Sequence, residues 1–243
     1  MNKTIILIFS ILYSLNIVAE NQQFIEANNL YANKQYKEAI VLYDSILTTG
    51  QASAELYYNI GNCYYKNQDW ANAIWNYEKS LQLNNNTLTI ENLELSRLKI
   101  TDKIESIPQL FYKKWWLSIS SIFNTYTWAI ISIILIWLYL IFWLLNNYFS
   151  KNTTILKKGF FYLVALSFSL TLSSYQNTLD KNEGIIFHSA INVLSAPDSS
   201  STILFSLHSG TKVMILDQIG NWIHIKITDG NKGWISKNSL KQL

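Results

Sequence analysis

The sequence has few charged residues and a single cysteine. Charged residues make up 14% of the 243 residues, well below the quarter that soluble proteins usually carry, while apolar residues make up 49%. We therefore expect part of the chain to lie in an apolar solvent. The one cysteine, Cys63, excludes an intramolecular disulfide and a metal site built on cysteines, and we expect it to be a small buried residue.

Residues typical of catalysis or of nucleic-acid binding are also scarce. The three histidines, His188, His208 and His224, lack the spacing of metal ligands and have no acid cluster beside them. The sequence contains no Gly-rich phosphate loop, no zinc-protease motif and no stripe of Lys and Arg. We therefore expect a protein that is not an enzyme, that holds no cofactor or metal and that does not bind nucleic acid.

The charges that are present divide the chain into regions. Residues 20–107 contain 11 acids and 7 bases, whereas residues 108–175 contain five lysines and no acid. Residues 1–19 combine Lys3 with a mostly apolar run and a small residue, Ala19, which is typical of an export signal peptide. Cleavage after Ala19 and retention as an anchor both stay open, because Ile17 is bulky for a cleavage site. In both cases the residues that follow are exported.

A self-similarity with a period of 34 residues begins after the export signal. It pairs Ala27 with Gly61, Leu30 with Tyr64, Tyr31 with Tyr65, Tyr36 with Trp70, Ala39 with Ala73, Ile40 with Ile74, Tyr43 with Tyr77 and Leu47 with Leu81. This period and these residues resemble tetratricopeptide repeats, an all-α helical repeat family. We predict a repeat domain over 20–107, with repeats at 20–53 and 54–87 and with Gly61 facing Ala73 where two helices cross.

Two repeats leave an apolar face uncovered, so a further helix is expected to cap them. The predicted capping helix spans residues 89–105. Its apolar side is expected to carry Leu93, Leu95, Leu98 and Ile104.

Residues 115–175 have the composition of a membrane segment. Two apolar stretches, 125–145 and 159–175, predict a two-helix transmembrane hairpin, and Lys113, Lys114, Trp115 and Trp116 before it suit the headgroup layer. The intervening loop, 146–158, contains Lys151, Lys157 and Lys158 and no acid. The positive-inside rule therefore places this loop in the cytoplasm, and the export signal places the repeats outside. Both soluble domains are then expected in the periplasm, attached to the inner membrane.

Residues 184–243 change to a period of two. Ile223, Ile225 and Ile227 alternate with polar or aromatic residues, and turn signals separate about five short strands, which predicts a small closed barrel. The elements Gly220-Asn221-Trp222, Asp229-Gly230 and Gly233-Trp234-Ile235 resemble a bacterial SH3 domain. We expect Trp222 and Trp234 to be mainly packing residues.

The order of these parts resembles the BatE family, encoded in the Bat aerotolerance operons. The predicted fold class is therefore multidomain, with an all-α repeat, a membrane hairpin and a small all-β SH3-like barrel. The resemblance implies an inner-membrane protein whose partners carry von Willebrand factor A domains and include a MoxR-type ATPase.

The same resemblance to tetratricopeptide repeats implies a partner-binding groove on the first helix of each repeat. The positions that carry over are Phe24, Asn28, Tyr31, Tyr58, Asn62 and Tyr65, with Lys66 beside them. An asparagine amide can both donate to and accept from a peptide backbone. Alternatively, Asn28 and Asn62 repeat only because the repeats duplicated, and Tyr31 and Tyr65 are core residues.

The predicted function is that of a membrane-tethered interaction protein that assembles a cell-envelope complex. The alternative is a sensor or accessory factor whose SH3-like domain binds cell-wall peptides.

Overall fold

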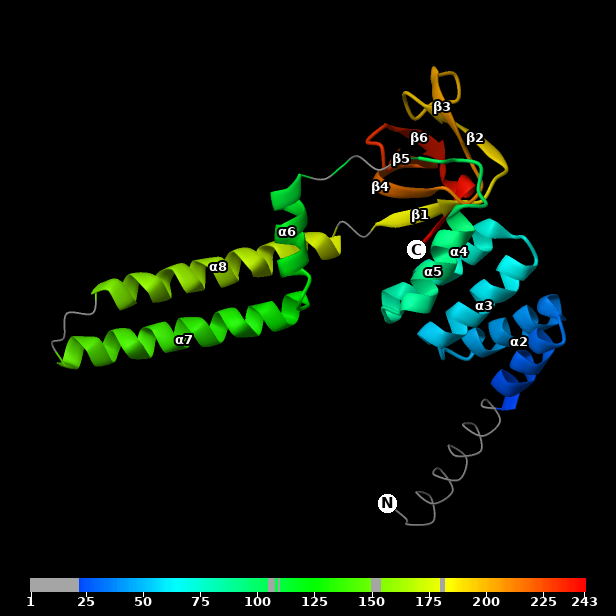
Figure 1. Ribbon diagram of the computed structural model, residues 1–243. Helices are drawn as coiled ribbons and strands as arrows, with labels where there is room; N and C mark the ends of the chain where they lie inside the picture. The colour runs from blue at the N-terminus through cyan, green and yellow to red at the C-terminus, as the bar shows by residue number, and fades with distance from the viewer. Residues whose placement is uncertain (1–21, 105–107, 109, 150–153, 180–181) are drawn as a thin grey trace, which may run out of the picture. The chain divides into compact units, whose positions relative to one another are not determined.

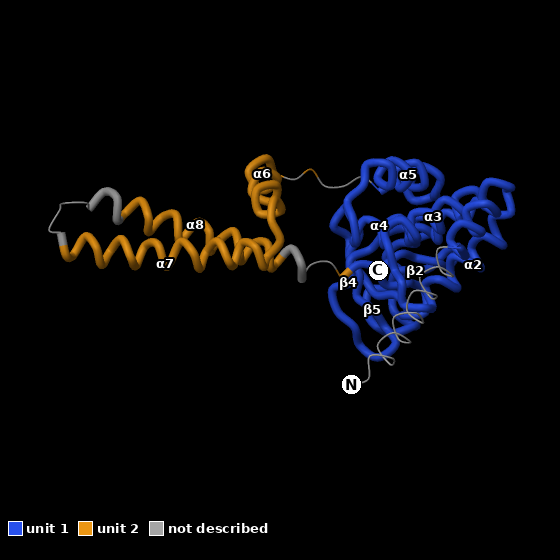
Figure 2. Tube along the Cα trace, turned by 90° about the horizontal axis from the view of Figure 1, so that it is seen from below, with its two compact units in different colours: residues 1–105, 183–243 blue, residues 106–182 orange. Residues whose placement is uncertain are grey.

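The computed structural model describes residues 22–104, 108, 110–149, 154–179 and 182–243. The chain forms two compact units, one made of residues 1–105 together with 183–243 and the other of residues 106–182 (Figure 2). The export signal predicted for residues 1–19 lies outside the described residues.

The helical part of the first unit follows the 34-residue period. Residues 22–32 are helical and are followed by α2 (Tyr36–Thr48), α3 (Ala54–Lys66), α4 (Trp70–Leu83) and α5 (Thr87–Arg97) (Figure 1). Ser53 and Asp69 cap α3 and α4 by accepting hydrogen bonds from the amides of Leu56 and Asn72. Each tight turn inside a repeat uses one residue with positive φ, Lys34 at 63° and Gln68 at 62°.

The close helix crossing at Gly61 differs in one detail from the prediction. A Cβ atom added at Gly61 would lie 2.6 Å from Cε1 of Tyr77, so the ring of Tyr77, and not Ala73, is its nearest neighbour. Tyr77 is 1% exposed and cannot move away into solvent. A small residue is needed here because an aromatic ring fills the crossing.

The capping helix is shorter than predicted. It ends at Arg97, and its buried face consists of Thr89, Leu93 and Ser96, which are spaced four and three residues apart. Leu95 and Leu98 are exposed, so the apolar side predicted for this helix was wrong at these two positions. Ile104 lies beyond the helix and packs against the core of the sheet.

The C-terminal part is a single antiparallel sheet. Its strands are β1 (Glu183–Ile186), β2 (Ala190–Leu194), β3 (Ile203–His208), β4 (Lys212–Ile219), β5 (Trp222–Lys226), β6 (Lys232–Ser236) and β7 (Leu240–Gln242). Their order is β3-β2-β6-β5-β4-β1-β7. The predicted alternation is confirmed, since Ile223 and Ile225 are buried in the sheet core.

The sheet has more strands than expected and is not closed by strand pairing. Seven strands replace the five or so that the turn signals indicated, because β1 and β7 add an edge beside β4. In the described part of the chain, no pairing joins the edge strands β3 and β7. The register shifts in β2 and β4 mark β-bulges, which bend the sheet around its core.

The sheet packs directly on the repeats. Ile185 of β1 belongs to the same buried cluster as Ala71, Ile74 and Tyr77 of α4. The indole Nε1 of Trp75 donates to the carbonyl oxygen of Gln242 over 3.0 Å. The ammonium of Lys241 lies 3.5 Å from the centre of the same indole.

Charged side chains complete this contact. The ammonium of Lys212 lies 3.0 Å from a carboxylate oxygen of Glu78 on α4 and 2.8 Å from one of Glu183. Asp102, in the segment after α5, accepts hydrogen bonds from the backbone N–H of His208 over 2.7 Å and from the Thr211 hydroxyl over 2.6 Å. Repeats and sheet, separate in the sequence, therefore form one folded unit.

The second unit contains α6 (Phe111–Ser120), α7 (Thr125–Phe149) and α8 (Thr154–Leu179). The helices α7 and α8 form a hairpin, and α6 runs across its end (Figure 1). Both long helices extend beyond the stretches 125–145 and 159–175 that were predicted. Among the described residues, one segment, Thr125–Tyr148 of α7, is long and apolar enough to cross a membrane.

Three of the hydroxyl groups that dilute α8 contact its neighbours. Thr171 Oγ1 is 3.1 Å from Ser132 Oγ of α7, and Ser174 Oγ is 3.1 Å from Thr125 Oγ1. Trp116 of α6 donates from Nε1 to the Ser173 hydroxyl over 3.0 Å. The second crossing that the sequence predicted is not confirmed, because α7 is the one helix that is long and apolar enough to span a membrane in the part of the chain that was described.

Candidate functional site

The seven residues predicted for a partner-binding groove lie on helical residues 22–32 and on α3. Phe24, Asn28 and Tyr31 come from the first of these helices, and Tyr58, Asn62, Tyr65 and Lys66 come from the second. Lys66 is exposed, and the other six side chains are partly buried.

Asn28 is held by two side chains of the repeat array. Its Oδ1 atom accepts a hydrogen bond from the hydroxyl of Tyr43 over 2.5 Å and another from Nδ2 of Asn59 over 3.2 Å. Tyr43 belongs to the second helix of the same repeat and Asn59 to the first helix of the next. Asn28 therefore joins two repeats.

Asn62 repeats this arrangement one period later. Its Oδ1 accepts from the hydroxyl of Tyr77 over 2.7 Å and from Nδ2 of Asn92 on α5 over 2.9 Å. The amide of Asn92 also lies 3.2 Å from the hydroxyl of Tyr58. The two asparagines thus begin a ladder of amide and tyrosine hydrogen bonds along the repeats, which we call the amide ladder (Asn28, Asn59, Asn62 and Asn92).

The amide ladder changes what Asn62 can offer a ligand. Because Oδ1 already accepts two hydrogen bonds, the side chain can no longer accept from a bound peptide. In the described part of the chain, no partner is present for Nδ2 of Asn62, and no buried side-chain nitrogen or oxygen lacks a partner. Nδ2 is therefore reachable from solvent, and Asn62 can donate to a peptide carbonyl.

The aromatic residues of the predicted groove are mostly in contact with other rings. Phe24 lies 5.8 Å from Tyr43 and Tyr58 lies 6.1 Å from Tyr77, measured between ring centres. Tyr65 meets Trp70 edge-on at 5.2 Å. Burial raises the pKa of Tyr31, so this hydroxyl stays protonated at neutral pH. These rings therefore take part in the packing of the repeats.

Sequence reasoning missed Asn59 and Asn92. They are 33 residues apart and so fall outside the 34-residue period, and they are not among the positions that the resemblance to tetratricopeptide repeats implied. Tyr43 and Tyr77 do follow the period. The spacing of 15 residues from asparagine to tyrosine in both repeats is a signal for the contacts of Asn28 with Tyr43 and of Asn62 with Tyr77, but it does not point to Asn59 or Asn92.

Possible reactive groups are held in structural roles. Cys63 is buried, and burial raises its pKa to about 12, so the thiolate that reacts with oxidants is scarce at neutral pH. Nδ1 of His208 lies 2.7 Å from Oδ1 of Asp102, which also binds the sheet to the repeats. Among the described residues, no group of three or more His, Cys, Asp or Glu side chains could hold a metal ion.

The sheet carries one aromatic pair that is partly exposed. His224 of β5 and Trp234 of β6 lie opposite each other in register, and their rings stack with centres 4.8 Å apart. Such a pair stiffens the sheet.

Comparison with known families identifies two domains. Residues 54–87 match the tetratricopeptide repeat model. Residues 189–241 match the bacterial SH3 domain model. Neither match covers half of the chain, and no curated protein matches the sequence. Tetratricopeptide repeats and SH3 domains typically bind other proteins and are typically not catalytic, and bacterial SH3 domains are associated with the cell envelope.

Proposed function

We propose that this chain is a membrane-anchored interaction protein without catalytic activity, whose repeat groove binds an extended segment of a partner protein in the cell envelope. The observation that carries the proposal is the fixed orientation of the Asn62 amide. Tyr77 and Asn92 hold Oδ1, so Nδ2 is available to a carbonyl group of the partner. The concave face of helical repeats is the surface that such arrays use for extended ligands.

The packing of the sheet on the repeats supports two membrane crossings. The hydrophobic unit, residues 106–182, lies between the two segments of the first unit in sequence. Because those segments pack together, they must lie on the same side of a membrane, and the chain between them must cross an even number of times. A crossing by α7 therefore requires a second one, and α8 is the helix that pairs with it.

Pairing also explains how a hydroxyl-rich helix can be accommodated in lipid. A hydroxyl group that faces a neighbouring helix can form a hydrogen bond there and does not face hydrocarbon. The pairs Ser132 with Thr171 and Thr125 with Ser174 are of this kind. We infer that the hairpin crosses the inner membrane, that the lysine-containing loop between its helices faces the cytoplasm, and that repeats and sheet lie in the periplasm.

The resemblance to BatE suggests which partners occupy the groove. Under this proposal they are Bat-type membrane proteins with von Willebrand factor A domains, and the complex works with a MoxR-type ATPase. The match of residues 189–241 to the bacterial SH3 domain favours a second candidate function, in which the sheet binds cell-wall peptides.

A conservative substitution tests the groove. Asn62→Asp keeps an acceptor oxygen for Tyr77 and Asn92 but replaces the Nδ2 donor by a second acceptor. We expect the full-length variant, purified in detergent, to capture about tenfold less envelope partner than the wild type, because a donated hydrogen bond is lost and a repulsive contact takes its place. Asn29→Asp, an exposed residue on the first repeat helix, is the matched control.

The outcomes separate the two functions. Equal capture by Asn62→Asp, Asn29→Asp and the wild type would refute binding in the groove. If, in addition, all three proteins co-sediment with purified cell wall, the second candidate function is supported instead.

A further inference from the structure

The helix α6 is held across the end of the hairpin where α7 begins and α8 ends (Figure 1). On one side, Trp116 of α6 donates from Nε1 to the Ser173 hydroxyl of α8 over 3.0 Å. On the other side, the buried Trp128 of α7 donates from Nε1 to the backbone carbonyl of Ser120 over 3.0 Å. These two indole hydrogen bonds fix the orientation of α6 on the hairpin.

The fixed orientation leaves one face of α6 exposed. Phe111, Lys114, Trp115 and Ser118 follow the spacing i, i+3, i+4 and i+7, so they lie on one side of the helix, and all four are exposed. The exposed fractions of the two rings are large, 85% for Phe111 and 65% for Trp115. An apolar and aromatic surface of this kind indicates an environment other than water.

The exposed face of α6 continues into the apolar surface of α7. Ile122 and Phe123, between the two helices, are exposed, and so is Tyr126 in the first turn of α7. Asn124 caps α7 by accepting from the backbone N–H of Thr127 over 2.8 Å, so α7 begins directly after this turn. The environment that covers α7 therefore extends to α6. Because α7 is long and apolar enough to cross a membrane, lipid is the environment that suits both helices.

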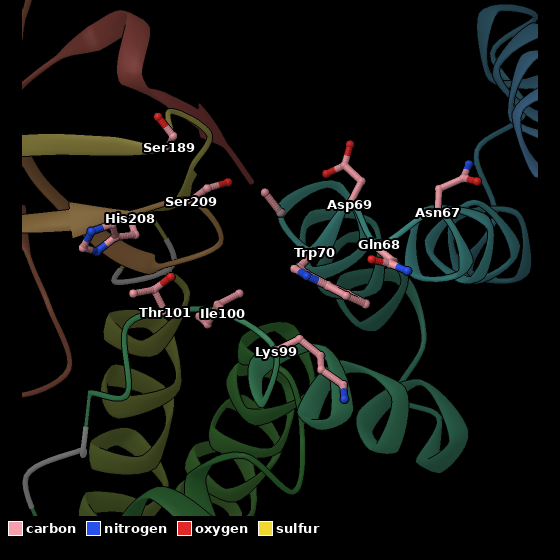
Figure 3. A pocket seen from close by; sticks show the side chains of 11 residues that line it. Asn67, Gln68, Asp69, Trp70, Lys99, Ile100, Thr101, Ser189, His208 and Ser209 are labelled. Atoms are coloured by element: carbon pink, nitrogen blue, oxygen red, sulfur yellow. The ribbon is translucent and has the colours of Figure 1, made fainter.

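The charge on α6 is positive. Lys113 and Lys114 are exposed, none of the salt bridges between described residues involves them, and residues 108–175 contain no acid. The cavity in the first unit differs in this respect, because Lys99 and the carboxylate of Asp69 both line it (Figure 3). Positive charge beside exposed aromatic rings is typical of helices that lie in the headgroup layer of an anionic membrane.

The place of these lysines needs a reason under the proposed topology. The positive-inside rule favours lysines in the cytoplasm, where the loop 146–158 carries three, yet Lys113 and Lys114 lie at the opposite end of the hairpin. Negatively charged lipid phosphates at that surface stabilise the two ammonium groups. A lysine can bury its alkyl chain against apolar groups while its charge stays among the headgroups.

We propose that α6 lies in the plane of the membrane surface and binds an anionic phospholipid, with Lys113 and Lys114 beside the phosphate and with Phe111 and Trp115 among the upper parts of the acyl chains. The inference rests on the membrane anchoring in the proposed function, but it does not depend on the groove. It adds a preference for lipids of one charge at one end of the hairpin.

The test measures how closely lipids of each kind approach α6. Full-length Ser118→Cys carries a fluorophore on the exposed face, while the buried Cys63 stays unlabelled. The protein is reconstituted into phosphatidylcholine vesicles with increasing amounts of a lipid whose acyl chains are brominated near the headgroup, since bromine quenches fluorescence only at short range. Each lysine at an anionic surface contributes about fivefold to binding, so half-maximal quenching is expected at about 25-fold less phosphatidylglycerol than phosphatidylcholine.

Substitution of the lysines tests the role of charge. Lys114→Gln should reduce the preference for phosphatidylglycerol to about fivefold, and the double variant with Lys113→Gln should abolish it, because each change removes one ammonium group. Lys158→Gln is the matched control, since this exposed lysine lies near the start of α8, at the other end of the hairpin. The control should keep the full preference.

The remaining outcomes overturn different statements. Equal quenching by the two lipids overturns the lipid proposal, and so does quenching by neither lipid in protein that floats with the vesicles; both leave the anchor in place. Protein that does not float with the vesicles overturns the anchor itself, while capture by the groove is measured separately with Asn62→Asp. Self-quenching that grows with protein density, without a preference between lipids, would assign this face of α6 to a second copy of the chain.

Discussion

Replacing Asp102 by alanine should loosen the sheet from the repeats. The carboxylate accepts hydrogen bonds from the backbone N–H of His208, from the Thr211 hydroxyl and from Nδ1 of His208, at 2.6 to 2.7 Å. Its side chain is 11% exposed, while that of His208 is 38% exposed. The perturbation therefore removes a nearly buried acceptor that binds His208, the last residue of β3, and Thr211 to the segment after α5.

The size of the expected loss of stability depends on which of the three donors can form a hydrogen bond to water once the carboxylate is removed. A hydrogen bond to a charged acceptor contributes about 1.5–3 kcal/mol, and a donor left without a partner costs about 1–3 kcal/mol. The histidine ring can turn to water, so it is counted as a small contribution. The backbone N–H and the Thr211 hydroxyl dominate, and we expect Asp102→Ala to lower the free energy of unfolding by about 2–4 kcal/mol. This corresponds to a fall in melting temperature of about 4–16 °C.

A double-mutant cycle with Thr211→Val isolates one of these bonds. Circular dichroism of the full-length protein in detergent gives the melting temperature of the wild type, of each single variant and of the double variant. A coupling of about 1–2 kcal/mol is expected, because both single variants break the same hydrogen bond. Glu91→Ala, an exposed acid of α5, should leave the melting temperature within about 2 °C of the wild type.

Additive effects in this cycle, or a change in melting temperature no larger than that of Glu91→Ala, would refute the role assigned to Asp102.

The pH dependence of stability gives a second test. Burial would raise the pKa of Asp102, but the hydrogen bonds from Thr211 and His208 outweigh burial and lower it. A carboxyl with a lowered pKa stabilises the fold above its unfolded pKa of about 3.9, and this contribution is lost as the pH falls through the lower native value. The difference between wild type and Asp102→Ala should therefore shrink below about pH 4.

Two further predictions concern Gly61 and Cys63. Gly61→Ala should destabilise the fold by about 1–3 kcal/mol, because the added Cβ would lie 2.6 Å from the buried ring of Tyr77; a melting temperature equal to that of the wild type would show that the ring can move. Cys63 should not react with a membrane-impermeant maleimide at pH 7 unless the protein is unfolded, since the thiol is buried with a pKa of about 12. Cysteines introduced at Lys158 and Asn231 then report the two sides of the membrane, and labelling of both from one side would refute the proposed topology.

The sequence predicted the elements of this protein better than their contacts. The 34-residue period located the repeats because the residues that follow it, such as Tyr43 and Tyr77, are core residues. Partners across repeats, such as Asn59 and Asn92, escaped detection, because a contact between neighbouring helices need not keep the period.

The packing of the sheet on α4 could also not be predicted, but for a different reason. Glu78 and Lys212 are ordinary surface residues by type, and nothing in their local sequence distinguishes a pair that meets across the chain. Likewise, the hydroxyls of α8 lower its hydropathy, and the sequence does not show that those of Thr171 and Ser173 contact α7 and α6. The residues predicted for the groove came from the resemblance to tetratricopeptide repeats, but only their contacts show that Oδ1 of Asn62 is held by Tyr77 and Asn92.

The discontinuous first unit also sets an order of events during biogenesis. The surface of α4 that carries Ile74 and Trp75 is covered by residues that are synthesised only after the whole second unit, residues 106–182. If the hairpin inserts with both ends on one side, the sheet can reach this surface and protect it. A chain whose second crossing fails would leave the surface exposed and the sheet stranded on the opposite side. Under the proposed topology, docking of the sheet therefore makes correct membrane insertion a condition for a stable, protease-resistant first unit.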